Sequence, residues 1–115
     1  MHGRGTEVDA MYRVHIWLRK SDGMSAEEFG RYWLETHAAI ARDGYANLRS
    51  YVVNLVTGAG RDQEVPYDGV AEMTWDSREE FVADMKSEAA AAGTEDMKNF
   101  TSAVGLLFVD QHVVK

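Results

Sequence analysis

Residues 12–19 have the sequence YRVHIWLR, and this stretch decides the fold. Valine, isoleucine and leucine at its even positions alternate with arginine, histidine and tryptophan at its odd ones. That two-residue period predicts a β-strand with one buried face. After a polar turn, Ser25 and Glu28 have the spacing of a capping box, in which each side chain satisfies a free helix amide. The sequence therefore predicts a helix that begins there and runs to about residue 41.

The predicted helix has one apolar side. A rotation of about 100° per residue aligns four residues in a stripe that is expected to face the core, and these are Phe29, Trp33, Thr36 and Ile40. Tyr32 and His37 lie on the two shoulders of that stripe. His37 is therefore expected at the edge of the slot between the helix and the sheet.

The rest of the chain repeats the same elements. Strands are predicted at 48–56, 70–75 and 104–109, with a polar surface loop at 58–68. A second capping box, at Ser77 and Glu80, predicts a second helix that ends at Gly93. Its predicted buried stripe consists of Phe81, Met85, Ala89 and Ala92.

The predicted element order is β-α-β-β-α-β, which is typical of an α+β ferredoxin-like fold with an antiparallel sheet and two helices on one face. Residues 11–115 are expected to form this single domain, and residues 1–10 a flexible N-terminal leader. The other sheet face would leave apolar surface uncovered, including Trp17 and Val70. We therefore expect a homodimer in which two copies pack through their sheet faces.

Composition excludes several classes of function. The 115 residues include 19 acidic and 12 basic ones, and the formal charge is −7, with no basic stripe, so nucleic acid is not an expected partner. The longest uncharged run, 99–109, is far shorter than the ~20 apolar residues that span a membrane. No cysteine is present, and no two of the four histidines are spaced four residues apart on a helix, so no metal site is expected. The first residues lack a secretory apolar stretch, which favours a cytoplasmic location.

His37 is the leading candidate for catalysis. An imidazole in an apolar slot is expected to stay uncharged, so it can accept a proton from a bound carbon or oxygen acid. The alternative is a structural histidine at the edge of the core that donates a hydrogen bond to a backbone carbonyl. Periodicity alone does not distinguish the two.

Other residues are candidates for binding a ligand. Tyr51, or failing it Tyr32, could donate a hydrogen bond to a developing oxyanion, although such tyrosines more often pack. Asn54 interrupts an apolar strand, so it either orients a ligand or faces solvent or the dimer partner. The expected apolar lining of the pocket consists of Trp33, Ile16, Met73 and Phe108.

One motif resembles a known family. The pattern Phe29-x-x-Tyr32-Trp33-x-x-x-His37, preceded by an Arg-Lys-x-x-Gly-Met-Ser turn at 19–25, is similar to the first helix of EthD-like proteins, within the dimeric α+β barrel superfamily. The resemblance covers residues 11–114. It implies a ferredoxin-like protomer that dimerises through its sheet, with a ligand pocket between sheet and helices and a functional histidine at His37. Relatives in that superfamily include cofactor-free oxygenases, cyclases, isomerases and haem-degrading monooxygenases.

These observations lead to one main hypothesis. The protein is predicted to be a small enzyme without a cofactor that acts by proton transfer on a hydrophobic cyclic or aromatic carbonyl compound, as an isomerase, lyase or cyclase in catabolic or secondary metabolism. One alternative is a carrier or accessory protein that binds a hydrophobic ligand without converting it. Another is a haem- or oxygen-dependent monooxygenase, with His37 as the axial ligand and Asn54 nearby.

Overall fold

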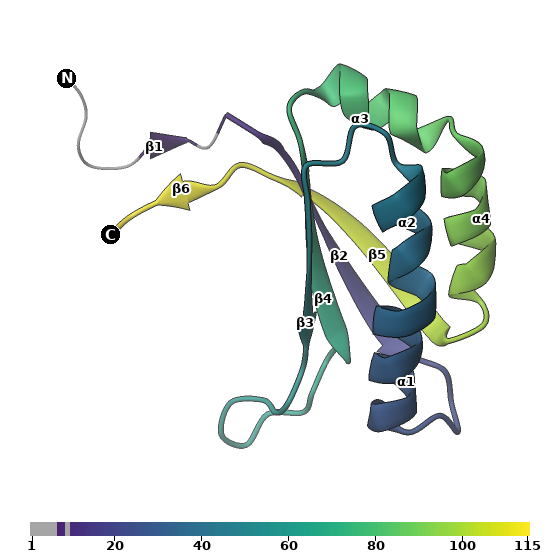
Figure 1. The fold of residues 1–115 in the computed structure, drawn as a ribbon. Helices are drawn as coiled ribbons and strands as arrows, with labels where there is room; N and C mark the ends of the chain where they lie inside the picture. Colours follow the sequence, from purple (N-terminus) through teal and green to yellow (C-terminus); the bar gives the residue numbers. More distant parts are fainter. Residues whose placement is uncertain (1–6, 9) are drawn as a thin grey trace.

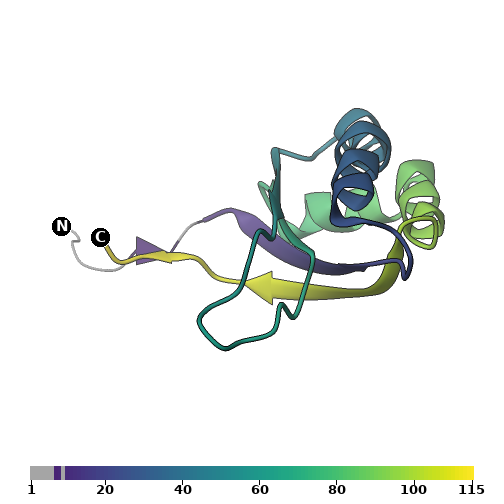
Figure 2. The same cartoon turned by 90° about the horizontal axis from the view of Figure 1, so that it is seen from below.

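A four-stranded antiparallel sheet with helices on one face forms the body of the protein (Figures 1 and 2). The computed structural model describes residues 7–8 and 10–115. The sheet contains β2 (Tyr12–Lys20), β3 (Ser50–Leu55), β4 (Gly69–Trp75) and β5 (Thr101–Val109), in the order β3-β4-β2-β5. The central strands are β2 and β4, and this strand order confirms the predicted ferredoxin-like fold.

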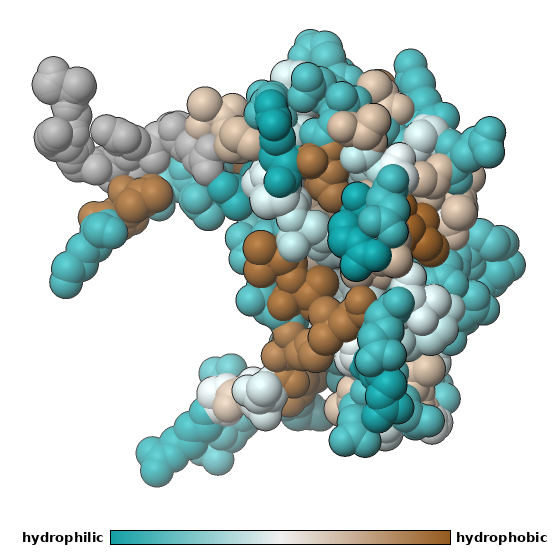
Figure 3. All heavy atoms as spheres, viewed as in Figure 1, coloured by the Kyte–Doolittle hydropathy of each residue, from teal (hydrophilic) through white to brown (hydrophobic). Residues whose placement is uncertain are grey.

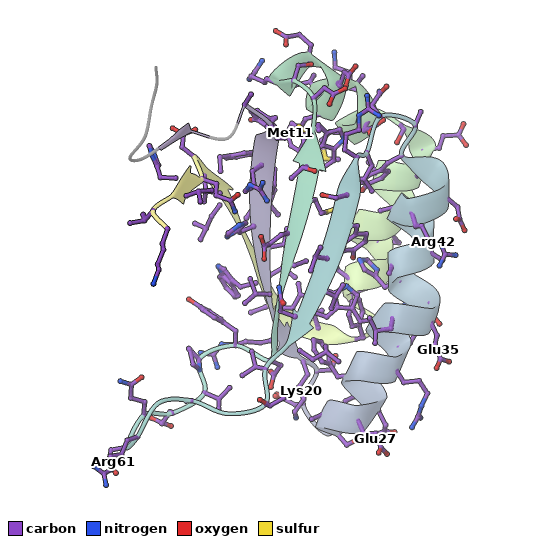
Figure 4. The ribbon with its side chains drawn as sticks, turned by 60° about the vertical axis from the view of Figure 1, so that its left-hand side comes forward. Met11, Lys20, Glu27, Glu35, Arg42 and Arg61 are labelled. Carbon is purple, nitrogen blue, oxygen red and sulfur yellow. The ribbon has the colours of Figure 1, made fainter. Side chains whose placement is uncertain are left out.

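The first helix is continuous and consists of α1 (Ala26–Tyr32), a π-helical turn η1 (Trp33–His37) and α2 (Ala38–Gly44). The predicted capping box is present. The Ser25 hydroxyl accepts a hydrogen bond from the Glu28 backbone amide, and the Glu28 carboxylate accepts one from the Ser25 backbone amide. Charged side chains such as Glu27, Glu35 and Arg42 lie on the outer side of this helix, away from the sheet (Figure 4). The apolar side packs on the sheet.

The π-helical turn changes which residues face the core. The Ala38 amide donates to the Trp33 carbonyl, five residues back, so this turn holds one more residue than an α-helical turn. As a result His37 lies over Trp33 and is buried, with 7% of its surface exposed. The prediction that Thr36 faces the core is wrong, since the wider turn rotates Thr36 to the exposed side. Phe29 and Trp33 are buried as predicted.

The second half contains two helices where the sequence predicted one. They are α3 (Arg78–Met85) and α4 (Glu88–Met97). Ser87 separates them. Its hydroxyl donates a hydrogen bond to the Asp84 carbonyl and accepts one from the Ala90 backbone amide, and the second bond caps the start of α4. The helix continues through Gly93 to Met97 rather than ending there. Because α4 is a separate helix, the predicted stripe does not continue into it. Its buried residues are Ala90 and Gly93 instead of the predicted Ala89 and Ala92, and Met85 is exposed.

The helices α2 and α4 pack antiparallel and unusually close. A Cβ atom on Gly44 would lie 2.5 Å from the Ala89 Cβ, and one on Gly93 would lie 3.8 Å from Ile40. The missing side chain at Gly44 therefore allows the two backbones to approach, whereas Gly93 marks an ordinary contact. The contacts pair residue 44 with 89 and residue 40 with 93, and this register brings residue 96 opposite residue 37.

The sheet has one covered face and one open face. Val14 pairs with Met73 and with Phe108, so these residues point to the same side, toward the helices. The largest fully buried side chains lie on this side of the molecule, and they are Trp33, Trp75, Phe29, Phe100, Leu18 and Val14. The opposite side, here called the open face, has no helix over it (Figure 2). By register it carries Arg13, His15, Trp17, Val52, Asn54, Val70, Glu72, Thr74 and Leu107.

Two further segments extend from this body. β1 (Glu7–Val8) and β6 (His112–Val113) form a two-stranded ribbon that projects beyond the sheet (Figures 1 and 2). The remainder of the predicted leader, residues 1–6 and 9, lies outside the described residues. The predicted loop at 58–68 contains no helix or strand, and Arg61 lies at its tip, away from Lys20 at the end of β2 (Figure 4). No helix in the described ranges is long and apolar enough to cross a membrane.

Candidate functional site

A cavity of about 370 Å³ lies between the covered face of the sheet and the helices. This volume falls within the range of small-molecule sites, roughly 300–1,000 Å³. Five residues that the sequence proposed for the site lie in its wall, namely Ile16, Trp33, His37, Tyr51 and Met73. Most of the remaining wall is aliphatic or aromatic. A ligand that fills the cavity must therefore be largely apolar, with a few polar groups to meet the hydroxyl and imidazole groups.

Three other proposed residues do not line the cavity. Asn54 lies on the open face, where its amide donates to the Val70 carbonyl and the Glu72 carboxylate. It is therefore on the wrong side of the sheet to stand beside a ligand at His37, as the haem alternative required. Phe108 is on the covered side but lies beyond the cavity, against the rings of Tyr12 and Phe81, with 58% of its surface exposed.

Tyr32 lies behind the site rather than in it. Its hydroxyl donates to the Asp96 carboxylate at 2.6 Å, and its ring packs on Phe100. It cannot donate to a ligand oxygen while it makes this bond. The role that the sequence left open for Tyr32, as a replacement for Tyr51, therefore does not fit the geometry.

His37 and Asp96 form the central pair of the site. The His37 Nδ1 atom lies 2.8 Å from the Asp96 Oδ2 atom, and their side chains are only 8% and 14% exposed. A carboxylate can only accept a hydrogen bond, so Nδ1 carries the proton and donates it. In the form of the ring that carries only this proton, the Nε2 lone pair is the group left for the cavity.

Asp96 is held in its ionised form. Burial by itself raises the pKa of Asp96, but hydrogen bonds from Tyr32, Asn99 and His37 outweigh it, so the pKa of this carboxyl lies below its ordinary value. The Asn99 side-chain amide donates a hydrogen bond of 2.9 Å to the Asp96 Oδ1 atom, which also accepts the hydrogen bond from Tyr32. Both carboxylate oxygens are thus engaged, and the orientation of the His37 ring is fixed through them.

Tyr51 has a free proton despite its hydrogen bond. The Trp33 Nε1–H donates to the Tyr51 hydroxyl oxygen at 2.9 Å, which leaves the Tyr51 O–H to donate elsewhere. Burial raises the pKa of Tyr51, only partly offset by the bond from Trp33, so the phenol stays protonated near neutral pH. Tyr51 is therefore positioned as a hydrogen-bond donor at the cavity wall.

Sequence reasoning missed two residues of the site, Asp96 and Tyr45. Asp96 is 59 residues from His37, in a stretch of α4 whose pattern does not distinguish it from neighbouring acids. Tyr45 follows α2 directly and lines the cavity. Burial, and then the proximity of Tyr51 and Asp84, raise the pKa of Tyr45. Its hydroxyl has no hydrogen-bond partner within the described part of the chain.

The site offers one nitrogen and several hydroxyl groups, and no metal-binding cluster. Across residues 7–8 and 10–115, no three His, Asp or Glu side chains converge to hold a metal ion. What the arrangement can do is accept a proton at His37 and donate hydrogen bonds from Tyr51 and Tyr45. Those are the functions of a general base and of oxyanion donors.

Comparisons with known proteins agree with this architecture. Residues 21–103 match the model of the EthD domain. The fold is similar to that of an EthD family protein from Bacillus halodurans, with a TM-score of 0.75 and 20% identity over 88% of this chain and 98% of that one. No curated protein matches the chain significantly.

Two structures described as dimeric are also similar in fold. One is a dimeric protein of unknown function and ferredoxin-like fold from Bacteroides fragilis, with a TM-score of 0.66 and 14% identity over 93% of this chain and all of that one. The other is a dimeric ferredoxin-like protein from Thermobifida fusca, with a TM-score of 0.62 and 15% identity over 96% of this chain and all of that one.

Proposed function

The chain belongs to the EthD family, and we propose that it is a small cofactor-independent enzyme that moves a proton on an apolar cyclic or aromatic carbonyl compound. The observation that carries this proposal is the His37–Asp96 pair at 2.8 Å, with the histidine ring in the wall of an apolar cavity. A merely structural histidine has no need of a cavity beside it.

The proposed mechanism uses the two ring nitrogens differently. Asp96 holds the proton on Nδ1, so Nε2 can take a proton from the carbon next to the ligand carbonyl. The ring is then positively charged, and the adjacent carboxylate stabilises that charge. The proton later returns to another carbon, which gives an isomer. If the ligand carries a leaving group on its β-carbon, the enolate can instead expel that group as the carbon–carbon double bond forms, and the imidazole gives its proton to the departing group, which is an elimination.

Tyr51 stabilises the other product of proton removal. The enolate oxygen that forms would accept a hydrogen bond from the free O–H of Tyr51. The Tyr51 oxygen itself accepts a hydrogen bond from the indole N–H of Trp33. A positioned general base typically contributes about 10² to 10⁴ in rate, and one oxyanion donor about 10² to 10³. Together these suffice for a C–H bond already activated by a carbonyl group.

Deuterium exchange tests the proposal without knowledge of the natural substrate. 1-Tetralone, a flat cyclic ketone, is incubated in D₂O with the protein, and loss of its α-proton signal is followed by NMR. We expect the protein to accelerate exchange, and His37→Gln to abolish the acceleration while 1-tetralone still quenches the fluorescence of the cavity tryptophans. Equal exchange rates in the wild type and His37→Gln would disprove the general-base role.

A hydrophobic-ligand carrier is the second candidate function, and it is favoured by the largely apolar wall of the cavity. A carrier would bind 1-tetralone without exchanging its α-protons. His37→Gln would then change affinity alone. The same experiment therefore separates an enzyme from a carrier.

We further propose a homodimer that forms through the open face. Val52 and Leu107 lie on this face, with 48% and 54% of their surfaces exposed, and a second copy would cover them. Figure 3 shows hydrophobic residues gathered in a band over the β3 side of the sheet. On the same face the His15 Nε2 atom is buried without a hydrogen bond and lies 3.6 Å from Glu72. The two similar structures described as dimeric support this assembly.

A further inference from the structure

Two phenol groups line the same cavity as His37, and they come from different parts of the chain. Tyr51 is on β3, and Tyr45 is in the connection between α2 and β3. The proposed mechanism uses only Tyr51. The position of Tyr45 relative to His37 indicates what the second hydroxyl recognises.

The packing of α2 on α4 places the Tyr45 hydroxyl along the cavity. A Cβ atom on Gly93 would lie 3.7 Å from this hydroxyl and 3.8 Å from Ile40. Gly93 precedes Asp96 by three residues, and Ile40 follows His37 by three residues. Since a helix rises about 1.5 Å per residue, the Tyr45 hydroxyl lies roughly one helical turn from the His37–Asp96 pair.

The Tyr51 hydroxyl is bonded to the indole of Trp33, which belongs to the same helix as His37. The cavity therefore has two hydroxyl donors from different elements in addition to the imidazole of His37. A ligand that meets both hydroxyls has two oxygen atoms.

We propose that Tyr45 determines specificity by donating a hydrogen bond to a second oxygen of the ligand, so that the preferred ligands are flat apolar rings with two oxygen acceptors. This inference rests on the proposed function and names the substrate class of the same site. Cyclic diones have two such oxygens.

The reason for the selectivity is the state of the Tyr45 hydroxyl. It has no hydrogen-bond partner within the described residues, and its phenol is protonated near neutral pH because burial raises the pKa of Tyr45. A ligand that fills the cavity displaces the water that would otherwise satisfy this hydroxyl. A ligand with one oxygen leaves it unpaired, whereas a ligand with two oxygens satisfies it.

A matched pair of probes tests this inference. 1,3-Indandione and 1-indanone share the same fused ring and differ by one carbonyl oxygen. Their dissociation constants are measured by quenching of tryptophan fluorescence, at a pH low enough to keep the dione uncharged. We expect the wild type to bind the dione about five- to tenfold more tightly, the effect of one hydrogen bond. Tyr45→Phe should remove this preference and leave the affinity for 1-indanone unchanged.

Tyr67→Phe is the matched control, because Tyr67 packs on Trp17 of the open face and does not line the cavity. It should retain the preference for the dione. A preference that survives in Tyr45→Phe would overturn the inference, and so would a wild type that binds the two probes equally well.

The inference and the proposed function fail in different ways. If the preference depends on Tyr45 but 1-tetralone shows no His37-dependent exchange, Tyr45 determines binding specificity and the enzyme proposal is wrong. If exchange occurs and the preference does not depend on Tyr45, the enzyme proposal holds and this inference is wrong. If no probe binds, both are wrong.

Discussion

His37 and Asp96 are 59 residues apart in the chain, and their side chains meet at 2.8 Å between the helix that carries the π-turn and α4. Both are largely buried, so the pair is weakly screened by water. The contact depends on two local features: the extra residue in the turn at 33–37 and the close approach of α2 and α4. The predictions below concern this pair and its surroundings.

Asp96→Asn should lower the rate of 1-tetralone exchange by about 10- to 100-fold, the usual cost of losing a residue that orients an imidazole. An asparagine amide can donate to Nδ1, which places the ring proton on Nε2 and removes the basic lone pair from the cavity. The dissociation constant of 1-tetralone should stay the same. Glu95→Gln is the control, because this exposed neighbour forms an ion pair with Lys98, and it should leave the exchange rate unchanged.

Tyr32→Phe should destabilise the fold by about 1–2 kcal/mol at pH 7, because it removes a hydrogen bond to a charged group while the ring still packs on Phe100. The effect should depend on pH. Folding lowers the pKa of Asp96 from about 3.9 in the unfolded chain. The hydrogen bond from Tyr32 therefore stabilises the fold fully when the pH is above the pKa of Asp96 in the unfolded chain. This stabilisation is lost as the pH falls through the pKa of Asp96 in the folded protein.

Urea denaturation at pH 7 and at pH 3 measures this dependence. The difference in unfolding free energy between the wild type and Tyr32→Phe should shrink at the lower pH. A difference that is constant with pH would mean that the contribution of the Tyr32 hydroxyl does not depend on the charge of Asp96.

Gly44→Ala should destabilise the protein by about 1–3 kcal/mol, the typical cost of forcing a methyl group into a packed contact. The new Cβ would lie 2.5 Å from the Ala89 Cβ, which has no flexible side chain to move aside. The helices must separate, and the His37–Asp96 contact lengthens with them, so 1-tetralone exchange should slow as well. Gly58→Ala meets no atom within 4 Å and should change the unfolding free energy by less than about 0.5 kcal/mol.

Leu107→Lys should convert the proposed homodimer into monomers, because it places a charge on the open face that the partner would cover. Sedimentation velocity at several protein concentrations gives the mass directly. Leu34→Lys is the matched control: Leu34 is similarly exposed, at 50% against 54%, but it lies on a helix outside the open face. A dimer that survives Leu107→Lys would show that the copies associate through another surface.

Local patterns were enough to predict the elements of the fold. The two-residue period of 12–19 and the capping residues Ser25 and Ser77 each act within a few residues of the chain, and the structure places the strand and both helix starts there. The prediction of one helix in the second half was wrong because another helix-capping residue lies inside that stretch. Ser87 starts a new helix inside a stretch that periodicity alone treats as continuous.

The site was predictable only in part. Five predicted residues line the cavity because side-chain direction follows from strand and helix periodicity. The sequence left Asn54 open to either a ligand or the solvent and dimer side, because an isolated polar residue in an apolar strand does not show which side of the sheet it faces. The order of strands and helices in space, and not their sequence, decides that side.

The sequence by itself determined that a helix carries His37 beside a sheet, since strand alternation and helix capping are properties of neighbouring residues. Only the tertiary structure decided that Asp96 holds His37, that Tyr45 joins Tyr51 in the cavity, and that Tyr32 lies behind it. Those contacts join residues from separate elements, and their distances depend on how closely α2 packs on α4, where the absence of a side chain at Gly44 allows the close approach.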